Sequence, residues 1–169
     1  MNRKSAVIAL VLVAAAPAAA FEVPQNRQEF VEAVLAGKGA TAAETFTVDQ
    51  PLHKIYDVLA ERANTCLDVT VSRTAYVGYV EHSSSDFNPT VRLAGKDRAE
   101  FTLQVIHNPR GVGATPPPNG LYIMAADLRS IDGNSTEIAL YRPTIGFKKI
   151  VQSVKLWFTG DAAACPKLR

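Results

Sequence analysis

Between residues 67 and 142 the chain is a succession of strand-like segments joined by mostly short connectors. The segments are rich in Val, Thr and Tyr, which favour strands, and they span residues 67–81, 88–93, 98–107, 121–131 and 136–142. Short connectors join antiparallel neighbours, because a parallel pair needs a crossover of about a dozen residues or more. The pattern therefore predicts an antiparallel meander sheet, with turns at Ser83–Asp86 and Gly95–Asp97.

The clearest turn signal is Asp132-Gly133-Asn134, which lies between the last two of these segments and predicts a hairpin. The longest connector, residues 108–120, contains three consecutive prolines, which cannot join a strand ladder. A connector of this length is often a contact surface, and it is equally often a plain flexible loop. Both alternatives remain open for residues 108–120.

Segments of helical periodicity flank the predicted sheet. A first helix is expected to begin at the capping residue Asn26 and to end at Gly37, and a short strand is expected at residues 44–48. A second amphipathic helix should follow Pro51, and a third should span Phe147–Phe158. The predicted fold class is therefore α+β: an antiparallel meander sheet packed against amphipathic helices, with a long C-terminal helix.

The first twenty residues have the features of a cleavable secretory signal. Arg3 and Lys4 precede a short apolar stretch, and a small-residue pattern ends at Ala20. An N-terminal membrane anchor is the alternative, but the apolar stretch is short for a membrane span. We therefore expect residues 1–20 to be removed. Residues 21–169 are then expected to form a single globular domain in the periplasm or outside the cell, without a transmembrane segment.

The charge balance argues against nucleic acid as a partner. The full chain has 18 Lys+Arg and 16 Asp+Glu, and loss of Arg3 and Lys4 would leave 18 − 2 = 16 basic residues against 16 acidic ones. A neutral mature protein has no overall electrostatic attraction to polyanions.

The chain has two cysteines, Cys66 and Cys165. Cys66 lies at the end of the apolar stripe of the second predicted helix, and Cys165 lies in the C-terminal tail. An even number of cysteines in an exported protein favours a disulfide, so we expect these two to be paired. Two unpaired buried thiols are the alternative.

No motif in the sequence indicates catalysis or metal binding. The histidines His53, His82 and His107 are not spaced from one another, or from Cys or acidic residues, as in known zinc sites. A Gly-x-Ser-x-Gly nucleophile motif is absent, and the cysteines do not form a Cys-x-x-Cys pair. The sequence therefore predicts no catalytic residue, no metal site and no cofactor.

The order of elements resembles the helix-grip arrangement of the START and Bet v 1-like superfamily. The resemblance is carried by the strand and helix in Glu44–Leu67 and by the terminal helix Phe147–Phe158. It implies a curved sheet that wraps the C-terminal helix and encloses an apolar cavity. The helix predicted from Asn26, before the first strand, departs from that arrangement, as does the export signal.

The chain also resembles a group of small exported proteins of proteobacteria with no known activity. In that group a cysteine closes the early helix, as Cys66 does here. A Trp-x-x-Gly-Asp run precedes a terminal cysteine, as Trp157, Gly160, Asp161 and Cys165 do here.

The principal functional hypothesis is a non-enzymatic periplasmic module that binds a lipid or another apolar small molecule. Its ligand contacts are expected to come from the sheet and the terminal helix, at Tyr79, Phe101, Leu103, Ile123, Val154 and Trp157. The second hypothesis is an envelope interaction or accessory protein with a solid core, which contacts a partner protein through residues 108–120 or the sheet face. An enzyme with a dispersed site is the third.

Overall fold

The computed structural model describes residues 22–76, 78, 80–109, 115–161 and 164–168. The expected signal, residues 1–20, lies outside these ranges, as does the predicted ligand residue Tyr79. In the described part of the chain, no helix has both the length and the apolar character needed to cross a bilayer.

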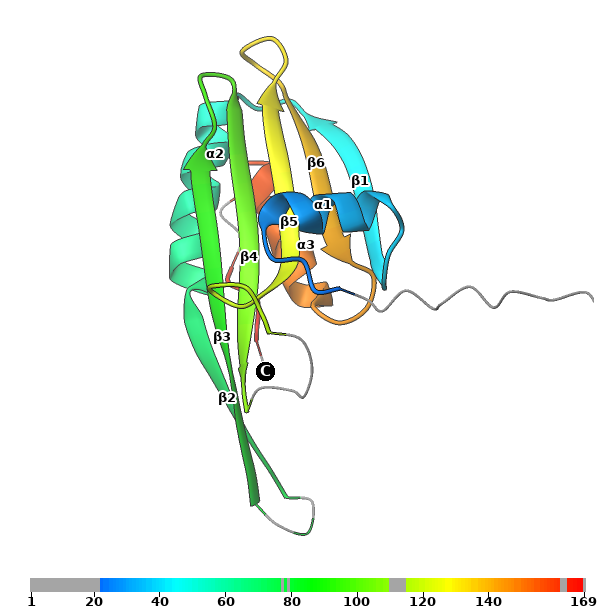
Figure 1. The fold of residues 1–169 in the computed structure, drawn as a ribbon. Helices are drawn as coiled ribbons and strands as arrows, with labels where there is room; N and C mark the ends of the chain where they lie inside the picture. The colour runs from blue at the N-terminus through cyan, green and yellow to red at the C-terminus, as the bar shows by residue number, and fades with distance from the viewer. Residues whose placement is uncertain (1–21, 77, 79, 110–114, 162–163, 169) are drawn as a thin grey trace, which may run out of the picture.

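Six antiparallel strands form one sheet, in the order β1-β6-β5-β4-β3-β2 (Figure 1). The strands are β1 (Thr41–Val48), β2 (Val69–Tyr76), β3 (Val80–Leu93), β4 (Arg98–Asn108), β5 (Leu121–Ser130) and β6 (Thr136–Pro143). Strands β2 to β6 are sequential neighbours, so the predicted meander is confirmed, and β1 is added at the β6 edge.

The predicted hairpin at Asp132-Gly133-Asn134 is confirmed between β5 and β6. The Asp132 carboxylate accepts hydrogen bonds from the backbone N–H groups of Asn134 at 3.0 Å and Ser135 at 2.8 Å. Gly133 takes a positive φ of 83°, a conformation that glycine adopts without a steric penalty. Local turn chemistry therefore fixes this connection.

Two predictions for the middle of the chain were wrong. Residues 67–81 are not one strand, because β2 ends at Tyr76 and β3 begins at Val80. Ser83–Asp86 is not a turn, because it lies within β3, where it pairs with β2 and, from Ser84 onward, also with β4. The polar side chains find cross-strand partners there: Thr70 Oγ1 donates to Asp86 at 2.7 Å. Pairing with two neighbours outweighs the local turn propensity of this segment.

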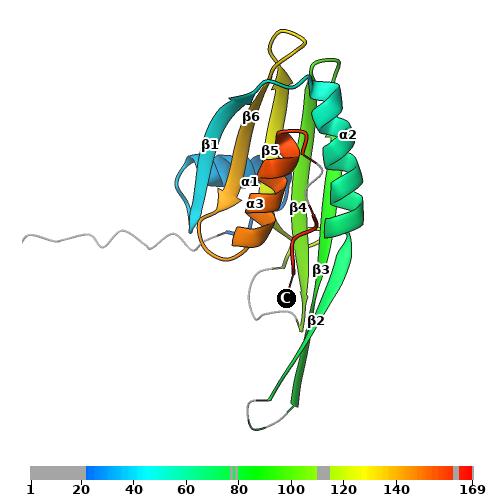
Figure 2. The same cartoon turned by 180° about the vertical axis from the view of Figure 1, so that it is seen from behind.

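In the described part of the chain, three α-helices cover the two faces of the sheet. They are α1 (Arg27–Leu35), α2 (Leu52–Arg62), which continues into a π-helical turn (Ala63–Leu67), and α3 (Lys148–Phe158). Helices α2 and α3 lie on one face, and α1 lies on the other (Figures 1 and 2). Asn26 caps α1 as predicted, because its side chain accepts a hydrogen bond from the Glu29 N–H at 2.9 Å.

The predicted C-terminal helix is confirmed to within one residue of its expected span 147–158, but it is a short helix rather than a long one. It has 11 residues, because Phe147, with a φ of 42°, adopts a left-handed conformation before it and Gly160, with a φ of 74°, follows its end. A helix of this length is about 16 Å long.

The main core lies between the sheet and helices α2 and α3. The apolar stripe of α2 contributes Leu52, Ile55 and Leu59, as its spacing predicts, and α3 contributes Trp157 and Phe158. A second, smaller cluster lies under α1. It consists of Phe30, Val34, Ala125 and Tyr141. Because both faces of the sheet are covered, β4 is buried on both sides over most of its length.

The predicted disulfide is confirmed. Cys66, in the π-helical turn after α2, is bonded to Cys165 of the C-terminal tail, at a sequence separation of 99. Their Cα atoms are 5.1 Å apart. The bond ties the end of one core helix to the segment that follows the other.

Candidate functional site

The predicted ligand residues within the described ranges all belong to the main core. Phe101 and Leu103 of β4 and Val154 and Trp157 of α3 are each 0% exposed, and Ile123 of β5 is half-buried against the same core. The sheet and the terminal helix therefore bring these side chains together, as the sequence indicated. They are packed inside the protein rather than arranged around a surface opening, and their role as ligand contacts stays a prediction.

A surface groove lies beside this core, between β1 and α3. Its volume is about 710 Å³, and its lining is mainly apolar. The lining residues are Phe46, Thr47, Val48, Gln152, Lys155, Leu156 and Thr159. Strand β1 forms one edge of the sheet, and Figure 2 shows α3 on the face of the sheet that α2 also covers. We call this hollow the β1–α3 groove.

The alternation of β1 places apolar side chains toward α3. Phe46 and Val48 are half-buried, whereas Thr45 and Thr47 are exposed. The Phe46 ring lies 6.3 Å from the ring of Phe158, which is fully buried, so the floor of the groove rests directly on the core. On the helix side, Leu156 is 46% exposed. The groove therefore offers apolar surface to solvent at a place supported by rigid packing.

Charged groups mark one side of the groove. The Glu44 carboxylate accepts hydrogen bonds from Arg142 Nε at 2.5 Å and from Lys155 Nζ at 2.8 Å. The same ammonium group lies 5.5 Å from the centroid of the Phe46 ring. Partial burial raises the pKa of Glu44, but the bonds from Lys155 and Arg142 outweigh it and hold that pKa below its ordinary value. One carboxylate between two cations leaves the cluster with a net positive charge.

Helix α3 adds to this positive character. It contains Lys148, Lys149 and Lys155 and no acidic residue. An anionic group at the Lys155 side of the groove would therefore meet a favourable local potential.

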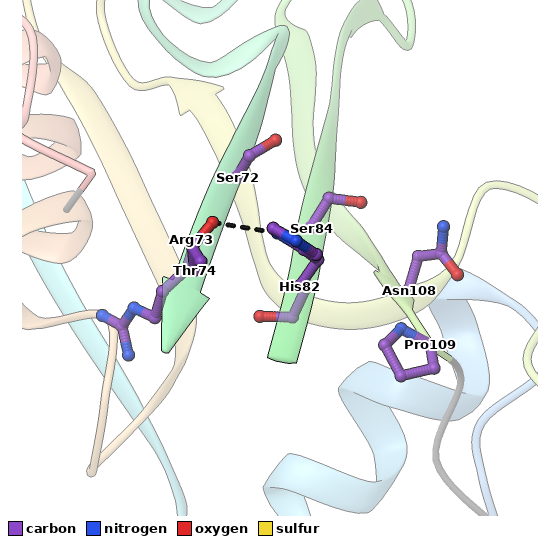
Figure 3. Close-up of a pocket in the computed structure, with 8 residues that line it drawn as sticks. Ser72, Arg73, Thr74, His82, Ser84, Asn108 and Pro109 are labelled. Atoms are coloured by element: carbon purple, nitrogen blue, oxygen red, sulfur yellow. Dashed lines mark hydrogen bonds between the residues drawn. The ribbon is translucent and has the colours of Figure 1, made fainter. Parts of the chain in front are cut away.

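A second hollow lies where β2, β3 and the end of β4 meet (Figure 3). Its volume is about 260 Å³, and its lining is mainly polar. It is lined by Ser72, Arg73, Thr74, His82, Ser83, Ser84, Asn108 and Pro109. The Thr74 hydroxyl and His82 Nδ1 are hydrogen-bonded at 3.0 Å, as the dashed line in Figure 3 shows. This hollow presents hydroxyl groups rather than an apolar surface.

The histidines on the sheet have separate partners. His82 is bonded to Thr74, and His107 Nδ1 is bonded to the Ser85 hydroxyl at 2.9 Å. Within the described ranges, no group of three or more His, Cys, Asp or Glu side chains could hold a metal ion.

The β1–α3 groove was not predicted from the sequence. Two signals pointed to it: the alternation that gives Phe46 and Val48 the same face of one strand, and Leu156 on the exposed side of α3. Neither signal shows that the two elements lie next to each other, since residues 49–147 separate them in the chain.

The sheet and the two helices on one face give the chain a coarse helix-grip architecture, with an additional helix on the opposite face. No family model and no curated protein matches the chain. One solved structure to which it is similar is the di-domain ARO/CYC StfQ from the steffimycin biosynthetic pathway, with a TM-score of 0.33 and 13% identity. The match covers 71% of this chain and 42% of that one.

Proposed function

We propose that this protein is an exported, periplasmic binding module for a small amphipathic molecule that has an apolar chain and an anionic head. The observation that carries the proposal is the β1–α3 groove, which combines an apolar floor with a cationic side. The exported location is supported by the sequence of residues 1–20. The Cys66–Cys165 disulfide is typical of proteins in oxidising compartments and supports it too.

The size and lining of the groove favour an alkyl or similar chain as the buried part of the ligand. Its volume of about 710 Å³ lies in the range of small-molecule sites. Burial of about ten methylene groups would contribute on the order of 8 kcal/mol, from which the costs of association must be subtracted. Because the groove is open on one side, we expect an affinity in the micromolar range or weaker.

The head of the ligand is expected to lie near Lys155. This ammonium group already bonds to Glu44, but Arg142 bonds to the same carboxylate, so one positive charge of the cluster is not neutralised. A carboxylate or phosphate head at this position gains a charge-assisted hydrogen bond, which a neutral alcohol of the same chain length does not. A preference for the anionic ligand should therefore depend on Lys155.

Calorimetric titration with dodecanoate and dodecanol tests the proposal. The unmodified protein should bind dodecanoate saturably and more tightly than dodecanol. Leu156→Gln should weaken both ligands by at least about tenfold, because it replaces exposed apolar surface in the groove with an amide. Lys155→Gln should weaken dodecanoate only, and by about threefold to tenfold.

The matched control is Leu35→Gln. Leu35 is 64% exposed and ends α1, on the opposite face of the sheet, so this variant should bind both ligands normally. Absence of saturable binding, or equal losses in the Leu35 and Leu156 variants, would contradict the groove as the binding site.

A further inference from the structure

Strands β2 and β3 extend beyond the rest of the sheet as a two-stranded arm. The last residue pair between β3 and β4 is Ser84 with Asn108, whereas β2 and β3 continue to pair from Arg73–Ser83 to Tyr76–Val80. These four additional pairs correspond to roughly 14 Å of ribbon. In both ribbon views the arm projects past every other labelled element (Figures 1 and 2). We call residues 73–76 and 80–83 the β2–β3 arm.

The end of this arm is apolar and exposed. Tyr76 is 78% exposed and Val80 is 57% exposed, although both are residue types that usually gain from burial. The charged residues of the arm, Arg73 and Glu81, begin behind this terminal pair, and their charges cancel. The arm therefore has an apolar end and a neutral polar shaft.

A protein partner does not fit this end well. The side chains of Tyr76 and Val80 together expose on the order of 250 Å², and a specific protein interface needs about 800 Å² from each partner. A lipid bilayer has no such minimum area, because its surface deforms around a small apolar projection. Tyrosine also favours the membrane interface, where its ring can be buried while its hydroxyl stays hydrated.

We propose that the β2–β3 arm inserts Tyr76 and Val80, its last described residue pair, into the interfacial region of a lipid bilayer. Insertion stops at this level, because Glu81 follows Val80 directly and because a two-stranded ribbon leaves backbone groups on its outer edges unpaired. The net charge of the arm is zero, so zwitterionic lipid suffices. This proposal is independent of the proposed function, since it does not involve the β1–α3 groove.

Helix α3 could bind membranes by a different mechanism, which would depend differently on lipid charge and on salt concentration. Its exposed residues Lys148 and Lys149 would attract anionic lipid, and salt would weaken that attraction. Insertion of the arm should instead persist in pure phosphatidylcholine and at high salt, because it depends on apolar contact.

Flotation of the mature protein with phosphatidylcholine vesicles, at low salt and at high salt, tests the proposal. The unmodified protein should float with the vesicles at both salt concentrations. The double variant Tyr76→Ser/Val80→Ser should reduce the bound fraction at least about fivefold. Its melting temperature should stay unchanged, because both side chains are exposed and outside the core.

Two further variants distinguish insertion of the arm from nonspecific adsorption through other exposed apolar side chains and from electrostatic attraction to lipid. Leu93→Ser/Ile145→Ser removes apolar side chains of comparable exposure, 58% and 71%, from outside the arm, and it should float normally. Lys148→Gln/Lys149→Gln should also float normally. The proposal is overturned if only anionic vesicles bind and the lysine variant abolishes that binding. It is equally overturned if the arm mediates a dimer in solution and vesicles do not bind.

Discussion

Two backbone segments approach each other closely at Gly120, just before β5. A Cβ atom at this position would lie 2.2 Å from the Val105 carbonyl oxygen, and the φ of Gly120 is 96°. The buried Gln104 side chain fixes the same segment, because its Nε2 donates hydrogen bonds to the carbonyl oxygens of Pro118 and Gly120, each at 2.8 Å. The register shift between β4 and β5 occurs at Leu103/Gln104, so a single glycine and a single amide shape this end of the connector.

Gly120→Ala should lower the free energy of unfolding by more than about 3 kcal/mol, because the new methyl group would overlap backbone atoms that cannot move aside. Gly133→Ala is the matched control. Its φ is also positive, at 83°, but no atom lies within 4 Å of the added Cβ, so only the conformational cost of about 1 kcal/mol is expected. Urea denaturation measures both, and equal losses would show that the contact with Val105 is unimportant.

At the scale of helices and strands, the sequence predicts well what local chemistry determines. The Asn26 cap, the apolar stripe of α2 and the turn at Asp132-Gly133-Asn134 each depend on residues within one or two turns of one another, and all three were correct. The turn predicted at Ser83–Asp86 was wrong, because this segment of β3 pairs with residues of β2 and β4. Sequence spacing does not reveal these partners. Tertiary pairing, rather than propensity, decided that segment.

The candidate site likewise combines features that the sequence predicts with features that only tertiary packing determines. Amphipathicity correctly placed Phe101, Leu103, Val154 and Trp157 on inward faces, but it cannot distinguish a residue that lines a cavity from one that is packed in the core. The β1–α3 groove depends on how far apart an edge strand and a helix come to rest, which is a property of packing. Its residues are therefore found only in the folded chain.

Glu44 links three elements, since it lies on β1 and bonds to Arg142 of β6 and Lys155 of α3. Its pKa is below the ordinary value of 4.5 in the folded protein, so the unfolded chain takes up a proton first as the pH falls. The stabilisation is fully present above about pH 4.5 and is lost as the pH falls through the folded pKa.

Glu44→Gln should therefore lower the free energy of unfolding by about 1 kcal/mol at neutral pH and should lose less stability than the unmodified protein between about pH 5 and about pH 3. Thermal denaturation across this range measures the difference. Glu137→Gln provides the control, because Glu137 belongs to a more exposed ion pair with Arg129 and should change stability by well under about 1 kcal/mol. A parallel acid dependence in Glu44→Gln and the unmodified protein would contradict this role.

For the whole molecule, the longest-range constraint is the Cys66–Cys165 disulfide. It closes a loop between positions 66 and 165, a sequence separation of 99, which contains strands β2 to β6 and helix α3. The chain-entropy model assigns on the order of 4 kcal/mol to a loop of this size, through restriction of the unfolded chain. The remaining described elements, α1, β1 and α2, precede the loop and are held to it by packing and strand pairing.

The double variant Cys66→Ala/Cys165→Ala should lower the melting temperature by about 10 °C, as the loss of on the order of 4 kcal/mol implies for a chain of this size. Alanine is the appropriate replacement, because Cys66 is only 4% exposed and serine would bury a hydroxyl group. The unmodified protein with a strong reductant should melt close to the variant. Identical melting temperatures with and without the bond would show that the disulfide does not contribute to stability.

This bond has a consequence for proteolysis. A single peptide cleavage anywhere between positions 66 and 165 leaves the two fragments covalently joined, because the bond connects the chain on either side of the cut. Intramolecular pairing across the sheet can then hold a nicked molecule in its native arrangement. Damage that would release a fragment from a reduced protein would here produce a molecule of almost unchanged mass, and the cut would be revealed only after reduction.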